Sequence, residues 1–202
     1  MLLFAVVVLL LTTLPLKGTA RDSHSVQWKR LERAWTAYRA TPDARNAAVF
    51  YQRLPRIPLP LGSLVPPGLV SKFYLALDWM GPRILAGDRW ASRIAFRFSA
   101  MADADFSEDL HAILGEMIRL HPMLFLQELQ LNRPAVSDLA NVVLSLDIDK
   151  FADASPERRK AELQARLDAL QALDLKDLDL MDLRSECTSL LGEEIVHGFD
   201  GE

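Results

Sequence analysis

The chain has 202 residues, 50% of them hydrophobic, and a formal net charge of −4 at pH 7. This length suffices for one compact domain with its own core and does not require a second domain. The acidic balance argues against a nucleic-acid partner, and the single cysteine, Cys187, excludes an intramolecular disulfide.

The first twenty residues predict a signal peptide for export. Residues 2–16 are almost entirely apolar, but this run is shorter than the roughly 20 apolar residues of an ordinary membrane-spanning helix. Small residues at Gly18 and Ala20 precede a switch to polar sequence at Arg21, as at a signal-peptidase cleavage site. We therefore expect cleavage near Ala20 and a periplasmic or secreted protein. Because no Lys or Arg precedes the apolar run, the alternative is an uncleaved segment 2–16 that anchors the protein to a membrane.

The next part of the chain predicts a helical hairpin followed by a proline-rich connector. Apolar and aromatic residues recur at three- and four-residue spacing from Trp28 to Tyr38, which is typical of a helix with one buried face. Thr41 as N-cap, followed by Pro42 and Asp43, predicts the start of a second helix that runs to Leu54. Residues 55–68 contain five prolines and cannot continue as a helix, because proline removes backbone donors.

The remaining sequence predicts further helices and no strands. Their expected ranges are 69–80, 88–101, 103–120, 123–131, 136–146, 156–173 and 174–191, with Gly81-Pro82, His121-Pro122 and Asn132-Arg133-Pro134 as breaks and 192–202 as a frayed tail. No segment alternates apolar and polar residues as a half-buried strand does. We therefore predict an all-α fold, either an irregular multi-helix bundle or a short stack of antiparallel helix hairpins. It would contain about eight or nine helices in a single domain over residues 21–191.

Charge is unevenly distributed along the chain. Residues 21–100 carry thirteen Lys or Arg against five Asp or Glu, whereas residues 174–202 carry two against nine, and residues 101–173 carry seven against thirteen. Two interpretations are open: the parts pack together and neutralise each other within one molecule, or the opposed charges steer association between molecules or with a charged partner.

The most suggestive candidate site is a stripe of arginines. Arg89, Arg93 and Arg97 recur every four residues and so lie on one face of the helix predicted to begin at Asp88. Three guanidinium groups in this arrangement can bind a carboxylate, a phosphate or an anionic lipid headgroup. The alternative is that they pair with the acids of residues 103–109 across a hairpin.

Metal sites and catalytic motifs are not predicted. Asp103, Asp105 and Ser107 begin like a calcium loop, but the sixth position is Glu108 and the twelfth is Leu114, where glycine and a bidentate acid are needed. The four histidines show no zinc-binding spacing, no Gly-x-Ser-x-Gly elbow is present, and glycine-rich phosphate loops are absent. The sequence therefore predicts no catalytic residues, no metal and no cofactor.

The leading functional hypothesis is an exported, non-enzymatic helical protein that binds another protein or an anionic surface. Binding would use a groove between helix hairpins or the basic N-terminal half. One alternative is a membrane-surface protein tethered by residues 2–16; another is a metal-assisted enzyme with an acidic and histidine site around Asp103, Asp105, Glu108 and His111. A monomer is favoured over an oligomer, and Cys187 is either an inert buried thiol or an intermolecular bridge.

Overall fold

A computed structural model describes residues 19–59, 65–102 and 104–198. Within these residues all regular secondary structure is helical and no β-strand is present, which confirms the all-α class. Residues 1–18 of the predicted signal peptide and residues 60–64 of the proline-rich connector lie outside the described residues. None of the described helices is both long and apolar enough to span a membrane.

The helices are numbered in chain order. They are α1 (Thr19–Ala40), α2 (Ala44–Tyr51), α3 (Pro67–Tyr74), α4 (Leu77–Leu85), α5 (Arg89–Phe98), α6 (Ala104–Leu120), α7 (Pro122–Asn132), the 3₁₀ helix η1 (Arg133–Ala135), α8 (Leu139–Leu144), α9 (Ile148–Phe151), α10 (Pro156–Gln171) and α11 (Leu178–His197).

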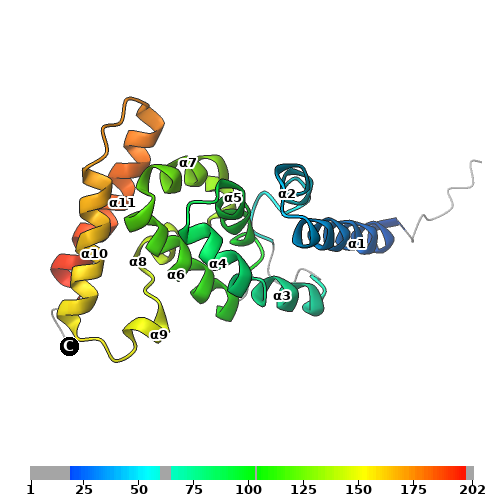
Figure 1. Cartoon of the computed structure of the whole chain (residues 1–202), viewed down its shortest axis with the longest axis horizontal. Helices are drawn as coiled ribbons and strands as arrows, with labels where there is room; N and C mark the ends of the chain where they lie inside the picture. Colours follow the sequence, from blue (N-terminus) through cyan, green and yellow to red (C-terminus); the bar gives the residue numbers. More distant parts are fainter. Residues whose placement is uncertain (1–18, 60–64, 103, 199–202) are drawn as a thin grey trace, which may run out of the picture.

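The helices are arranged along one long axis (Figure 1). The hairpin of α1 and α2 lies at one end, α4 to α7 form the middle, and the long hairpin of α10 and α11 forms the other end. Contacts follow this order: α2 packs on α5, α5 on α7, α6 on α8 and α10, and α11 on α7, α8 and α10. The first and last helices of the described chain therefore lie at opposite ends of this arrangement.

Side-chain caps explain where several helices begin. The Asp88 carboxylate accepts hydrogen bonds from the backbone N–H groups of Trp90 and Ala91 at the start of α5, and Ser155 accepts one from Arg158 at the start of α10. These starts agree with the expected ranges 88–101 and 156–173. The predicted N-cap of α2 was wrong. Asp43, rather than Thr41, caps this helix by accepting from the N–H of Asn46 at 2.8 Å.

The structure contains more and shorter helices than the sequence predicts. The expected helix over 69–80 is divided at Leu75 and Ala76 into α3 and α4, and Gly81-Pro82 lies inside α4 instead of ending a helix. A Cβ at Gly81 would come within 3.3 Å of the Ile113 side chain, so glycine lets α4 approach α6 closely. At the other end, α11 continues beyond Leu191 to His197 because Ile195 is buried.

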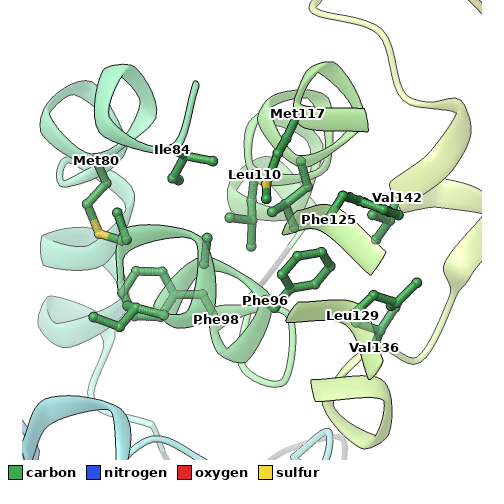
Figure 2. Close-up of a cluster of buried hydrophobic side chains, with 14 of the residues drawn as sticks. Met80, Ile84, Phe96, Phe98, Leu110, Met117, Phe125, Leu129, Val136 and Val142 are labelled. Atoms are coloured by element: carbon green, nitrogen blue, oxygen red, sulfur yellow. The ribbon is translucent and has the colours of Figure 1, made fainter. Parts of the chain in front are cut away.

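One continuous apolar core runs through the middle of the molecule. Figure 2 shows side chains from α4, α5, α6, α7 and α8 meeting there, among them Met80, Phe96, Leu110, Phe125 and Val142. An aromatic cluster extends this core towards α1; its rings are Trp35, Tyr38, Phe50, Phe73, Phe98 and Phe106. Burial of these faces is the main stabilising contribution to the fold.

A buried arginine joins α10 to the end of α8. Arg166 is 1% exposed and donates to the backbone carbonyls of Val143 and Ser145, both at 2.9 Å. Those carbonyls belong to the last turn of α8 and its C-cap, where no intrahelical donor is available. A Cβ at Gly115 would overlap the Arg166 guanidinium, so glycine at this position leaves space for it. The sequence places Arg166 among the polar residues of a long amphipathic helix and gives no sign of this burial.

The stacked rings of Phe73 and Phe98, 4.9 Å apart, provide a test of the core. Phe98→Ala is expected to lower the free energy of unfolding by about 3–5 kcal/mol, because it leaves a cavity among buried rings. The surface control Val196→Ala, at a residue 57% exposed, is expected to change it by less than about 0.5 kcal/mol. Urea unfolding followed by circular dichroism measures both. Equal effects of the two substitutions would contradict the packing.

Candidate functional site

The arginine stripe of α5 faces α7 and binds a buried carboxylate there. Glu128 is fully buried. Arg93 donates from Nε to its Oε2 at 2.7 Å and from Nη2 to its Oε1 at 2.9 Å, and Arg89 donates from Nε to Oε1 at 3.0 Å. Hydrogen bonding to Glu128 raises the pKa of Arg93, in spite of the opposing effect of burial. A carboxylate with two guanidinium partners satisfies the requirement that a buried charge be paired.

The third arginine joins three helices. Arg97 is 7% exposed and donates to the Tyr51 hydroxyl at 2.5 Å and to Asn132 Oδ1 at 3.2 Å. Its guanidinium also lies 4.5 Å from the centre of the Tyr51 ring, and it reaches the Pro55 carbonyl at 3.5 Å. Arg97 therefore attaches α2 and the chain after it to α5 and α7.

These contacts correct one of the two sequence interpretations of the stripe. The predicted partners, the acids of residues 103–109, were wrong: the partner carboxylate is Glu128, because α5 packs against α7. An external anion at Arg93 and Arg97 would compete with the groups that already occupy them. Arg89 retains a side chain 57% exposed. Binding of an anion or partner by the stripe stays a prediction.

The buried carboxylate is tested with Glu128→Gln. Loss of its charge leaves Arg89 and Arg93 without their acceptor pair, and we expect a loss of about 3–5 kcal/mol in the free energy of unfolding. The control is Glu186→Gln, which removes the same charge from an exposed pair with Arg133 and is expected to cost less than about 1 kcal/mol. Denaturant titration at neutral pH compares the two variants; a Glu128→Gln protein as stable as the control would contradict the network.

A second cluster of arginines lies in the N-terminal hairpin, where α1, the end of α2 and the residues just after α2 line a groove open to solvent. Two adjoining pockets of about 690 Å³ and 440 Å³ make up this groove. The first is lined by Val26, Gln27, Arg30, Gln52, Arg53, Leu54, Pro55 and Arg56, and the second by Arg30, Arg33, Ala34, Val49 and Arg53. Arg30 and Arg53 belong to both pockets. We call the whole feature the α1–α2 groove.

The α1–α2 groove is positively charged without local compensation. Arg30, Arg33, Arg53 and Arg56 are exposed, and no carboxylate of the described residues lines either pocket. In residues 26–59 the only acids are Glu32 and Asp43. Glu32 pairs with Lys72 and Asp43 caps α2, so neither neutralises the groove. Guanidinium groups held in this way bind carboxylates or phosphates by paired hydrogen bonds.

The charge imbalance seen in the sequence is also an imbalance in space. Arg89 and Arg93 share one carboxylate, that of Glu128 in the middle segment. Among the described residues, however, no ion pair joins a cation of residues 21–100 to an acid of residues 174–202. The acids of α11 lie at the opposite end of the molecule from α1 and α2 (Figure 1). Single charges at each end are paired, such as Glu32 with Lys72 and Glu186 with Arg133, but no ion pair of the described residues joins the basic end to the acidic end.

The sequence signalled this groove only indirectly. The excess of cations in residues 21–100 indicates a basic surface but does not locate it. The regular spacing of Arg89, Arg93 and Arg97 instead favours the stripe of α5 as the candidate site. Arg30 lies on α1 and Arg53 lies in the turn just after α2, so nothing in their spacing shows that they line the same pocket. The geometry of the hairpin brings them together.

Other candidate chemistry is not assembled in the described part of the chain. No group of three or more His, Cys, Asp or Glu side chains there could hold a metal ion. Asp105, Glu108 and His111 lie on α6, while Asp103 is outside the described residues. Burial, the larger cause, lowers the pKa of His111, although nearby Asp138 opposes this effect. Comparison of the chain with family models, curated proteins and solved structures finds no match.

Cys187 is fully buried on α11, and burial, reinforced by nearby Glu186, raises the pKa of its thiol to about 12. Because the thiolate is the reactive form, we expect no reaction with iodoacetamide at pH 8 in the folded protein and full reaction in denaturant. Mass spectrometry of the two samples measures the modification. Rapid labelling of the folded protein, or a disulfide-linked dimer isolated under non-reducing conditions, would contradict the inert interpretation.

Proposed function

We propose that this chain is an exported, non-enzymatic helical protein that binds an acidic segment of another protein in the α1–α2 groove. The observation that carries the proposal is the set of four exposed arginines that line one groove without a carboxylate among them. The apolar leader of residues 2–16 and the small residues before Arg21 support export.

The shape of the groove favours a segment of a macromolecule over a small ligand. It is open to solvent and extends across two adjoining pockets, whereas small-molecule sites are concave and enclose most of the ligand. Its lining combines arginines with the apolar side chains of Val26, Leu54 and Pro55. A segment with carboxylates on either side of an apolar side chain would satisfy both kinds of surface.

One observation favours a second candidate, binding to an anionic membrane. Val26 and Ile57, 44% and 64% exposed, lie at or next to the groove arginines, and exposed apolar side chains beside cations are typical of membrane-surface proteins. This candidate corresponds to the tethered form, in which residues 2–16 are retained. We favour a protein partner because the apolar lining lies within a groove, where a protruding side chain fits and a flat membrane does not.

The proposal is tested with the double variant Arg30→Glu/Arg53→Glu, at the two arginines shared by both pockets. The probe is a fluorescein-labelled peptide of alternating aspartate and leucine, and fluorescence anisotropy measures its affinity. We expect the double variant to weaken binding by at least about tenfold, equivalent to about 1.4 kcal/mol. Binding by the wild-type protein should also weaken as salt is raised.

The matched control is Arg39→Glu/Arg45→Glu, which changes the net charge of the N-terminal hairpin by the same amount at exposed positions of α1 and α2 outside the groove. An equal loss of affinity in both variants would show that only net charge matters, and it would overturn the proposal that the α1–α2 groove is the binding site. Flotation with phosphatidylglycerol vesicles tests the membrane alternative. Strong vesicle binding without peptide binding would replace the proposed protein partner with an anionic membrane.

N-terminal sequencing of the protein from cells tests export, with Arg21 expected as the first residue.

A further inference from the structure

The opposite end of the molecule carries an exposed acidic surface with a leucine at its centre. It lies where α10 turns into α11, and its members are Asp174, Asp177, Leu178, Asp179 and Asp182, all exposed. Leu178 is 74% exposed, the highest exposure among the large hydrophobic residues of the described chain. We call this surface the acid–leucine corner. Because its side chain is exposed to water, Leu178 contributes little hydrophobic stabilisation to its own molecule.

Most of the corner's carboxylates have no strong partner. Asp177 accepts a hydrogen bond from the N–H of Leu180 as the N-cap of α11, and Asp179 makes one long contact, 3.5 Å, with the Gln130 amide. No ion pair of Asp174 or Asp182 occurs among the described residues. Asp174 and Asp182 thus remain available to a cationic, partly apolar surface, while Asp177 and Asp179 add negative charge and exposed Lys176 in the same turn offsets one charge.

We infer that the α1–α2 groove of one molecule takes the acid–leucine corner of a second copy. This inference rests on the proposed function, because it identifies the acidic segment that the groove binds. The four groove arginines would face the four corner aspartates, and Leu178 would enter the part of the groove lined by Val26, Leu54 and Pro55. The complementarity is both electrostatic and apolar, as in specific protein interfaces.

The shape of the molecule makes this contact intermolecular. The hairpin of α1 and α2 that carries the groove and the turn from α10 into α11 that carries the corner lie at opposite ends of the long axis (Figure 1). The helices between them are packed on a common core. A molecule therefore cannot place its own corner in its own groove. Because the two surfaces differ, the contact is head-to-tail, and repeated contacts extend into a chain of molecules unless the rotation between neighbours closes a ring.

The corner also distinguishes a second copy from a lipid surface as the occupant of the groove. Anionic headgroups would satisfy the arginines of the groove. They would repel the four aspartates around Leu178, so the exposed leucine would remain without a partner. A second copy covers both surfaces in one contact.

The test is sedimentation velocity of the purified protein over a concentration series at low and high salt. We expect association of the wild-type protein at low ionic strength and its loss near 1 M salt, where the screening length falls to about 3 Å. Arg30→Glu/Arg53→Glu and Asp174→Lys/Asp182→Lys should each be monomeric. Asp177 is left unchanged because it caps α11. The control Arg39→Glu/Arg45→Glu should associate like the wild type.

Mixing the two monomeric variants provides the decisive measurement. One has a groove of two arginines and two glutamates beside an unchanged acidic corner, and the other has an unchanged basic groove beside a corner of two lysines and two aspartates. An unchanged groove and an unchanged corner therefore meet only in the mixture. Association of the mixture is the expected result, and its absence would overturn the inference. A wild-type protein that stays monomeric at every salt concentration would also overturn it. The groove would still stand as the proposed binding site if that monomer bound the aspartate–leucine peptide.

Discussion

The position of the candidate groove depends on the guanidinium of Arg97. This buried group binds the Tyr51 hydroxyl at the end of α2, the Pro55 carbonyl just after it, and Asn132 on α7. The chain between Tyr51 and Pro55 supplies part of the groove lining. The polar network inside the protein therefore fixes the orientation of a surface on its outside. Buried polar groups must be satisfied together, so the groove wall cannot shift without loss of these hydrogen bonds.

The use of acidic residues elsewhere in the fold explains why the groove arginines remain available. Asp43, Asp88 and Asp177 cap helices, and Glu128 is buried between α5 and α7. Each of these carboxylates satisfies a donor that the helical fold would otherwise leave unpaired. The N-terminal hairpin has few acids of its own, and those of α11 are at the far end of the molecule. The net charge of −4 conceals two exposed surfaces of opposite sign.

The helices were predictable from local chemistry, whereas the partners of charged side chains were not. The caps at Asp88 and Ser155 mark helix starts that the structure confirms, because N-capping needs only a side-chain oxygen three residues from a free N–H. The division between α3 and α4 at Leu75 and Ala76 was missed. The predicted break at Gly81-Pro82 was wrong, because these residues lie inside α4, where Gly81 packs against Ile113. In these cases tertiary packing outweighed local preference.

By itself, the sequence determined the all-α class and the excess of basic residues near its start and acidic residues near its end. These properties depend on neighbours in the chain and on composition. Only the tertiary structure decided that Glu128 pairs with Arg89 and Arg93 of the regular arginine stripe, that Arg166 is buried, and that Arg30 and Arg53 line one open groove. The physical reason is that a charge is neutralised by whatever lies within a few ångströms of it, and helix packing, rather than distance along the chain, sets those neighbours.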